Sequence, residues 1–221
     1  MTTTTHTHST PDVHEMVVVH RAFRREAPAL AEYVRRTPKG DTARAKVVAD
    51  HLRLCLAGLE MHHTGEDVVL WPLLLERAAP STGLVETMQA QHHAIDANIE
   101  LVTPALEAWE AAPNPETAER VAAVMDRMTA ALIEHLDLEE REILPIAARH
   151  VSAEEWDRMR EHGKDSMTPA QLPIMFGLVL EEADAEERAR MLAGLPLPIS
   201  LLLRTVGAWQ FKRYVRRLRS A

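Results

Sequence analysis

The sequence is poor in cysteine, glycine and aromatic residues. Its 221 positions include one cysteine (Cys55), eight glycines and only 4% aromatic residues. A single cysteine excludes an internal disulfide framework and any CxxC zinc or redox site. Alanine, leucine, glutamate, arginine and methionine recur instead. Because these side chains lose little rotamer freedom in a helix, we expect an all-α protein.

Long hydrophobic runs are also missing. The longest runs, such as IMFGLVL and LPLPISLLL, are shorter than the ~20 apolar residues that span a bilayer, so we expect no transmembrane segment. Residues 1–10 have neither the basic head nor the apolar segment of a signal peptide, and we expect a disordered leader there. Together with the low cysteine content, this favours a cytoplasmic protein.

Acidic residues outnumber basic ones over most of the chain. The formal net charge is -8, but the last 21 residues carry six bases and no acid. The rest therefore carries 19 bases against 33 acids, a balance of -14. Such a charge is unfavourable next to phosphates, so we expect no nucleic-acid partner. The six bases are Arg204, Lys212, Arg213, Arg216, Arg217 and Arg219.

Helix-capping residues divide the chain into segments. Helix start signals precede apolar-periodic stretches at Thr10-Pro11-Asp12, Asp41, Ser81, Asn114-Pro115-Glu116, and Ser152. Four long helices are predicted at about 11–36, 42–79, 82–111 and 115–149. Short polar joints between long helices favour an up-down-up-down four-helix bundle over residues 11–150. A C-terminal extension, residues 151–221, is predicted to hold shorter helices at 153–165, 169–183, 185–194 and 198–219.

Two of the long helices carry the same polar pattern. The segment HHTGEDVVLWP, 62–72, aligns with HLDLEEREILP, 135–145, at an offset of 73. The aligned pairs are His62 and His135, Glu66 and Glu139, Asp67 and Glu140, and Pro72 and Pro145. An offset of 72 places His20 on His92. The bundle therefore looks like a duplicated helical hairpin that keeps its polar positions.

Each long helix also contains a proline, which is expected to kink or interrupt it because proline lacks the backbone N–H. These prolines are Pro28, Pro72, Pro104 and Pro145.

The polar positions are expected to lie at one height in the bundle. Two residues of an antiparallel hairpin share a height when they are equidistant from the joint. His20 and His62 have their midpoint at position 41, and His92 and His135 have theirs at 113.5, both inside predicted joints. The 62–66 pair and His92 centre near 78, beside the joint APST. The four helices should therefore bring their histidines together.

Such a cluster points to metal. Residues four apart share a helix face about 6 Å apart along the axis, so each His–Glu pair can chelate one ion. Burying four imidazoles and two carboxylates is costly unless something compensates them. Imidazole with carboxylate suits iron, manganese or zinc, and two bridging carboxylates fit two metals roughly 3.5 to 4 Å apart.

Two other metal motifs fit less well. The Glu-x-x-His spacing of ferritin-like di-iron bundles occurs at Glu60 and His63 but is not repeated before His135, where Leu132 stands. No HExxH occurs, so a zincin-type protease has no support.

With these residues identified, the sequence resembles the hemerythrin-like, HHE cation-binding family over about residues 12–150. The phrases VHRAFRRE, HHTGEDVVLWP, QHHAID and HLDLEEREILP are similar to its actinobacterial members. The resemblance implies a non-haem di-iron centre with an oxo or hydroxo bridge. It implies terminal histidine ligands and two bridging carboxylates at His20, His62, His92, His135, Glu66 and Glu139.

The sequence departs from the oxygen-carrying members of this family. They have a second histidine four residues after the first on helix three, where this chain has Asp96. An anionic or missing ligand should stabilise ferric iron, which favours chemistry with peroxide or nitric oxide, or iron and redox sensing, over reversible dioxygen carriage. Ligation by Asp96 is the less favoured interpretation of that residue. For His63, one position past His62, we favour a half-exposed histidine over an additional ligand.

Other polar residues have two interpretations. Asp67 and Glu140 are either partners of imidazole N–H groups or solvated surface acids. His51 lies three helical turns from His62, ~16 Å along the axis, which places it outside the centre. We interpret Cys55 as a small buried hydrophobe.

The C-terminal segment carries an apolar stripe beside its arginines. The stripe consists of Leu203, Gly207, Phe211, Tyr214 and Leu218. It could lie on an anionic membrane surface, or it could pack on the bundle with the arginines facing the acidic body. We favour packing.

Together with the family resemblance, these patterns imply a protein that binds or reacts with dioxygen, peroxide or nitric oxide at a carboxylate-bridged iron pair. Peroxide decomposition of a catalase-like kind is one form of this chemistry. The alternative is an iron- or redox-sensing binding module without turnover, in which the state of the metal changes what the extension contacts.

Overall fold

The protein is all-helical, as predicted. The computed structural model describes residues 10–78, 81–165 and 167–220, and this part of the chain contains helices and no strand. The predicted leader lies outside the described residues except for Thr10. No helix in the described ranges is both long enough and apolar enough to cross a membrane.

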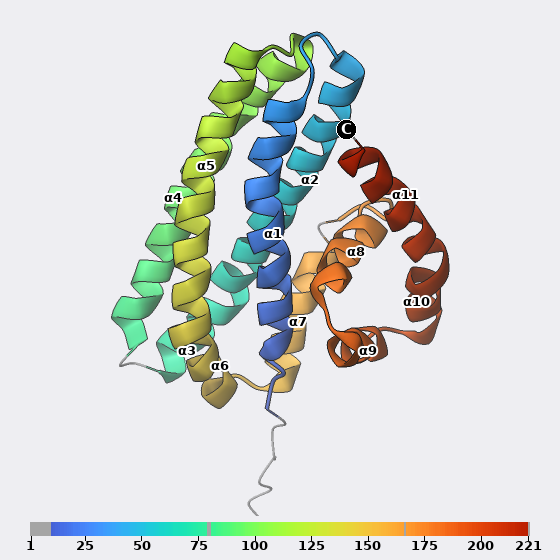
Figure 1. Cartoon of the computed structure of the whole chain (residues 1–221). Helices are drawn as coiled ribbons and strands as arrows, with labels where there is room; N and C mark the ends of the chain where they lie inside the picture. The colour runs from blue at the N-terminus through green and yellow to red at the C-terminus, as the bar shows by residue number, and fades with distance from the viewer. Residues whose placement is uncertain (1–9, 79–80, 166, 221) are drawn as a thin grey trace, which may run out of the picture.

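Four long rods lie side by side (Figure 1). They are α1 (His14–Arg36), α2 (Thr42–Gly65) continued by α3 (Trp71–Arg77), α4 (Thr82–Ala111), and α5 (Pro115–Leu138) continued by α6 (Leu144–His150). Helices α1 and α4 each pack against both α2 and α5.

The predicted starts of the second, third and fourth long helices are correct, at Thr42, Thr82 and Pro115, and that of the first is about three residues early. The Asp41 side chain accepts a hydrogen bond from the Arg44 backbone N–H at 2.9 Å, and Asn114 caps α5 in a capping box. Helix α1 begins at His14 rather than near residue 11. Asp12 accepts from the His14 backbone N–H but does not cap the helix.

Two of the four prolines coincide with a change of helix type. The second and fourth rods each contain one turn of π-helix, Glu66–Leu70 (η1) and Glu139–Ile143 (η3), just before Pro72 and Pro145. By contrast, α1 and α4 run without a break through Pro28 and Pro104. The predicted interruption is therefore observed only in the duplicated segment.

Both π turns begin at a glutamate of the predicted metal set. The backbone N–H of Trp71 bonds to the carbonyl of Glu66, and that of Leu144 bonds to the carbonyl of Glu139. This i to i−5 pattern shifts the following residues around the rod by part of a turn, and such single π turns are frequent at functional sites. The duplicated sequence thus folds into a duplicated local distortion.

Hydrophobic residues form two clusters along the rods. One contains Leu30, Leu59, Ile95 and Leu132 among others, and the second contains Met16, Leu70, Met88 and Ile143 among others. On the first three rods the predicted ligands fall between the residues of one cluster and those of the other, and on the fourth His135 lies beside Leu136 at the end of the first cluster. A polar layer therefore separates two apolar layers in the bundle.

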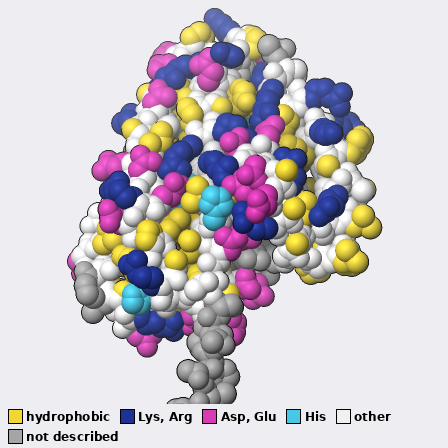
Figure 2. All heavy atoms as spheres, turned by 60° about the horizontal axis from the view of Figure 1, so that its bottom comes forward, with side chains coloured by type: hydrophobic (Ala, Val, Ile, Leu, Met, Phe, Trp, Pro, Cys, Tyr) yellow, Lys and Arg dark blue, Asp and Glu magenta, His cyan; other side chains and the backbone are white. Residues whose placement is uncertain are grey.

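The extension lies beside α1 and α2 in Figure 1. Its elements are α7 (Ala153–Asp165), α8 (Leu172–Glu182), α9 (Ala185–Ala193), α10 (Leu197–Leu202), a π turn η4 (Leu203–Gly207) and α11 (Ala208–Arg219). Helix α8 contacts α1, and α7 contacts α2. We call the contact between the bundle and the extension the seam. Ion pairs lie along it, for example Arg77 with Glu155 at 2.7 Å and Arg21 with Glu187. Figure 2 shows acidic and basic side chains interleaved across the face that it presents.

The apolar stripe of the C-terminal segment faces inward in part. Gly207 and Leu218 are buried, and the Arg44 side chain donates to the backbone carbonyl of Leu218 at 2.6 Å. The neighbouring face of the same segment is open, because Leu201 and Trp209 are 61% and 59% exposed.

Candidate metal centre

The six predicted ligands come together in the polar layer between the two apolar clusters. His20 comes from α1, His62 from α2, His92 from α4 and His135 from α5, while Glu66 and Glu139 open the two π turns. All are buried except His62, whose side chain keeps 9% of its surface exposed. The arithmetic of joints and heights therefore placed these residues at the same level as the structure does.

The histidines form two pairs. The Nε2 atoms of His20 and His62 are 3.2 Å apart, and those of His92 and His135 are 3.3 Å apart. We call these the first pair and the second pair. Each pair combines one histidine from the first helix of a hairpin with one from the second helix, so the pairs follow the duplication in the sequence.

Each glutamate reaches both pairs. Glu66 lies with Oε1 at 3.2 Å from His62 Nε2 and with Oε2 at 3.3 Å from His92 Nε2. Glu139 Oε2 lies 3.3 Å from His20 Nε2 and 3.7 Å from His135 Nε2. Each carboxylate is thus placed between the two pairs, as a carboxylate that bridges two cations must be.

Several polar atoms at this centre have no hydrogen-bond partner in the protein. Eight buried side-chain nitrogen and oxygen atoms among the described residues have no hydrogen bond, and six of them belong to Glu66, Glu139 and His63. Buried polar groups are nearly always hydrogen-bonded, because leaving them unpaired is costly. Imidazole and carboxylate ligands suit iron, manganese or zinc. Orphaned carboxylates that face imidazole nitrogens therefore fit bound metal cations.

Burial disfavours the charged forms of Glu66, Glu139 and His135 when no cation is present. It raises the pKa of Glu139 to about 8, and the facing Glu66 adds to the rise. Burial also raises the pKa of Glu66 well above its usual value and lowers the pKa of His135 to about 2. A cation reverses the penalty on the carboxylates, so metal uptake should release protons.

An outer carboxylate orients the first pair. His20 Nδ1 lies 2.9 Å from Oε1 of Glu140, and Arg24 donates to the same oxygen at 2.5 Å. Because a carboxylate only accepts, the proton of His20 sits on Nδ1 and the lone pair of Nε2 points into the centre.

The second pair has the equivalent contact. His92 Nδ1 donates to Oδ1 of Asp67 at 2.9 Å, and the Trp71 indole donates to the same oxygen at 2.8 Å. Asp67 and Glu140 are therefore imidazole partners and not solvated surface acids. Such partners fix the tautomer and orientation of a ligating histidine.

A third histidine has an outer contact, because Gln91 Oε1 lies 3.2 Å from His135 Nδ1. Sequence reasoning missed Gln91 and the indole of Trp71. The sequence did contain a signal for both, because Gln91 directly precedes His92 and Trp71 directly precedes Pro72, and His92 and Pro72 are aligned positions of the repeat.

The expectation for His63 was wrong. Its side chain is not half-exposed: the residue is 2% exposed and stacks on the His92 ring, with centroids 4.0 Å apart. His63, His92 and His135 offer nitrogen atoms that all lie within 4.8 Å of one another. His63 therefore belongs to the second pair as a third imidazole.

Asp96 lies near the candidate metal centre but outside its groups of ligand atoms. It is half-buried one turn after His92, and burial raises its pKa. It is in neither of the two groups of ligand atoms at the centre, which consist of His63, His92 and His135, and of His20, His62, Glu66 and Glu139.

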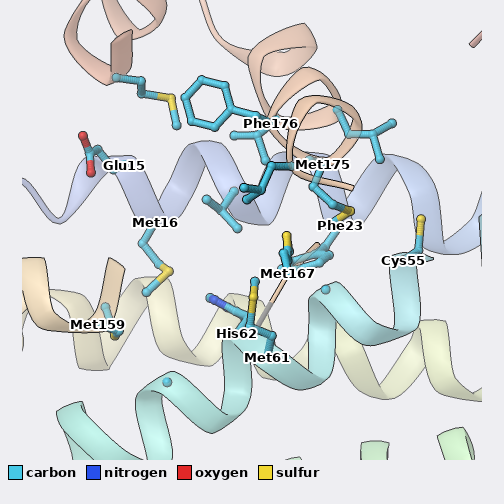
Figure 3. A pocket seen from close by; sticks show the side chains of 18 of the residues that line it. Glu15, Met16, Phe23, Cys55, Met61, His62, Met159, Met167, Met175 and Phe176 are labelled. Carbon is cyan, nitrogen blue, oxygen red and sulfur yellow. The ribbon is translucent and has the colours of Figure 1, made fainter. Parts of the chain in front are cut away.

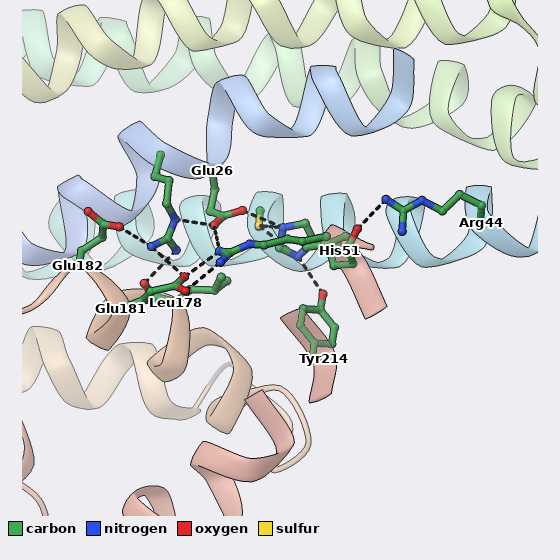
Figure 4. A network of polar contacts seen from close by, with 11 residues as sticks. Glu26, Arg44, His51, Leu178, Glu181, Glu182 and Tyr214 are labelled. Carbon is green, nitrogen blue, oxygen red and sulfur yellow. Dashed lines mark hydrogen bonds and ion pairs between the residues drawn. The ribbon is translucent and has the colours of Figure 1, made fainter. Parts of the chain in front are cut away.

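A separate polar group lies where α1, α2 and α11 meet (Figure 4). His51 contacts the Tyr214 hydroxyl through Nδ1 at 2.8 Å and Glu26 Oε2 through Nε2 at 3.0 Å, and Arg25 donates to Glu26 Oε1. Cys55 Sγ lies 3.6 Å from His51 Nε2 and is buried.

The ligand atoms of Glu26, His51 and Cys55 are within metal-binding distance of one another, but none of the nitrogen or oxygen atoms of these residues is without a hydrogen bond. The group therefore connects α11 to the bundle through protein contacts. As expected, His51 is not part of the metal centre, and Cys55 is buried.

The comparisons with known proteins agree with this geometry. A family model described as the hemerythrin HHE cation binding domain matches residues 12–147. That range covers more than half of the chain and contains all six predicted ligands. Comparison with curated proteins and with solved structures gives no match.

Proposed function

The chain belongs to the hemerythrin HHE cation-binding family, and from this premise we propose that it holds two non-haem iron ions bridged by Glu66 and Glu139. At this pair it binds or reacts with a small oxidant, namely dioxygen, peroxide or nitric oxide. The observation that carries the proposal is the set of orphaned carboxylate oxygens between two histidine pairs.

The proposal takes the four rods to follow the up-down-up-down order that the family resemblance and the short joints favour. It assigns His20 and His62 to one ion, and His92 and His135 to the other. His63 is a candidate additional ligand of the second ion.

The bound ions supply redox chemistry and an open position for a small oxidant. The chain supplies the rest. Glu140 and Asp67 hold the Nδ1 protons of His20 and His92, so that both imidazoles present a lone pair to the metal. The two apolar clusters exclude water from either side of the polar layer, which strengthens every electrostatic contact inside it.

Metal analysis combined with an absorption spectrum of the purified protein tests the cofactor. We expect two iron ions per chain and a charge-transfer spectrum typical of a bridged ferric pair. Two colourless ions, such as zinc, would contradict the assignment of iron, and a metal-free protein that cannot be loaded would contradict the whole proposal.

Peroxide consumption tests reactivity. We expect consumption to follow iron loading and to be lost in Glu66→Ala, because that variant removes a carboxylate shared by both ions. Glu142→Ala is a matched control, since Glu142 lies in the second π turn but is exposed. Tight binding of an oxidant without turnover would favour a carrier or sensor over an enzyme.

A second candidate function is an iron or redox sensor. It is favoured by the position of the extension, whose helices line a cavity that includes His62 in its wall. Limited proteolysis with and without iron separates the two candidates. Identical cleavage of residues 151–221 in both states would contradict the sensor.

A further inference from the structure

A cavity of about 270 Å³ lies between the bundle and the extension (Figure 3). Its walls come from α1 and α2 on one side and from α7, α8 and α9 on the other. For comparison, an apolar cavity of ~150 Å³ in another protein is large enough to bind benzene. The volume here is sufficient for a small organic molecule.

The lining of this cavity is apolar and rich in thioethers. Six of the ten methionines of the chain line it. They are Met16, Met61, Met159, Met167, Met175 and Met191. Methionine is flexible and polarisable, and it forms adaptable surfaces that accept ligands of varied shape. Gly58 adds room for one of them, since a Cβ at this position would lie 2.3 Å from Met175 Cε.

The cavity has little charge to offer a ligand. Among its described lining residues none is lysine or arginine, and the acids are Glu15 and Glu26. The oxygens of Glu26 are occupied by His51 and Arg25. An anionic ligand would find no cation here, and burying it would be costly. The lining therefore selects for an uncharged, hydrophobic molecule.

The cavity is partly open to solvent, so water can reach its apolar walls. An apolar occupant would remove the methionines, and Phe23 and Phe176, which also line the space, from water, and such burial is favourable.

The cavity also reaches the metal centre. His62 is in its wall, and its side chain is the most exposed of the six predicted ligands, at 9% against 0 or 1% for the others. Phe23, another lining residue, contacts the His62 ring with centroids 5.2 Å apart. Whatever fills the cavity therefore lies against a ligand of the first pair.

From these contacts we infer that the cavity is a binding site for an uncharged, hydrophobic small molecule, and that its occupancy is sensed at the metal centre through His62. Binding itself requires no metal. The coupling to His62 rests on the proposed function, because it needs a metal ion at the first pair.

Fluorescence titration of the full-length protein with N-phenyl-1-naphthylamine, an uncharged dye, tests the site. We expect saturable binding of one dye per chain. Leu195→Trp places a bulky side chain at the cavity wall and should weaken binding at least tenfold. Leu101→Trp is the matched control, because Leu101 is 58% exposed on α4 and does not line the cavity.

Val179→Trp fills the cavity from α8 and provides an independent variant if Leu195→Trp fails to fold. The anionic dye 8-anilino-1-naphthalenesulfonate should bind more weakly than the uncharged one. If both cavity variants bind the uncharged dye as tightly as the unmodified protein and Leu101→Trp do, the site is elsewhere and the inference is wrong.

The coupling is tested by titrating the metal-free and iron-loaded proteins with the same dye. We expect dye affinities that differ at least threefold, together with a shift of the iron absorption band when dye is bound. By linkage, the dye must then change iron affinity by the same factor. Equal affinities and an unchanged band would refute the coupling. Dye binding to the metal-free protein remains measurable even if the chain binds no iron, so failure of the proposed function is distinguishable.

Discussion

The two histidine pairs of this bundle belong to the two halves of one sequence repeat, but they have different surroundings. The second pair is enclosed and has a third imidazole, His63, stacked on His92. The first pair has no such addition, and its His62 has an edge in the cavity formed with the extension. We therefore expect the second pair to hold its ion more tightly and the first pair to be the more accessible.

Single substitutions within the repeat account for much of this difference. The position aligned with His63 in the other half is Leu136, and the position aligned with Arg24 is Asp96. Arg24 supports the carboxylate that orients His20, whereas the indole of Trp71 supports the carboxylate that orients His92. Glutamate occupies the aligned position in both halves, Glu66 and Glu139.

The largest expected effect comes from removing both ions at once. A ligand at about a thousand times its Kd stabilises a fold by ~4 kcal/mol, so chelation should lower the melting temperature markedly. In Glu66→Ala the orphaned carboxylate is gone and little metal should bind. Calorimetry with and without EDTA should then show a large shift for the unmodified protein and almost none for this variant. Equal shifts in both would show that Glu66 does not hold metal.

A smaller effect is expected when the third imidazole of the second pair is removed. His63→Leu should weaken one of two iron-binding steps by at least tenfold and leave the other unchanged, giving a biphasic metal titration. His93→Leu is the matched control, because His93 is the exposed neighbour of His92. If His63→Leu and the control titrate alike, His63 is only a packed core residue and the two pairs are more equal than proposed.

The outer carboxylates should have effects of a similar or smaller size. Losing such a partner typically costs 10- to 100-fold in metal affinity. We expect Glu140→Gln to weaken the ion at the first pair and Asp67→Asn to weaken the ion at the second. Glu140→Gln should be the more damaging, because it leaves the Arg24 cation close to a bound cation. A reversed order in isothermal titrations would contradict this account of the asymmetry.

The sequence alone predicted which six polar residues come together better than it predicted their surroundings. Their convergence followed from the offset of 73 and from distances to the joints, because both depend only on helix periodicity and chain length. The burial of His63 did not follow, because a 100° step around an ideal helix placed it at the margin of the core. The structure shows that α4 brings His92 against it.

The cavity also could not be predicted from the sequence. Its methionines come from α1, α2, α7, α8, α9 and the segment before α8, and periodicity within one helix cannot tell which other helix it faces. The π turns were foreseen only as interruptions at proline. Their occurrence at Pro72 and Pro145 but not at Pro28 and Pro104 depends on the packing around each helix.

The smallest expected effect concerns the seam that keeps the extension over the first pair. Hydrogen bonds from Arg77 and from the Ser152 backbone lower the pKa of Glu155 to about 2, and Arg21 lowers that of Glu187 to about 2. A carboxyl whose pKa is lowered by folding stabilises the fold above its usual pKa, near 4.5. That contribution is lost as the pH falls from about 4.5 towards 2.

Acid should therefore loosen the extension before the bundle, and it should alter the surroundings of His62 before those of His135. Hydrogen exchange at pH 3.5 and pH 6 should show faster exchange in α7 and α9 at the lower pH and little change in α4 and α5. Glu155→Gln should reduce this difference in α7, whereas Glu154→Gln, at an exposed position, should not. If α4 and α5 exchange as readily as α7 and α9, the extension is as firmly held as the bundle, and the accessibility of the first pair does not depend on this seam.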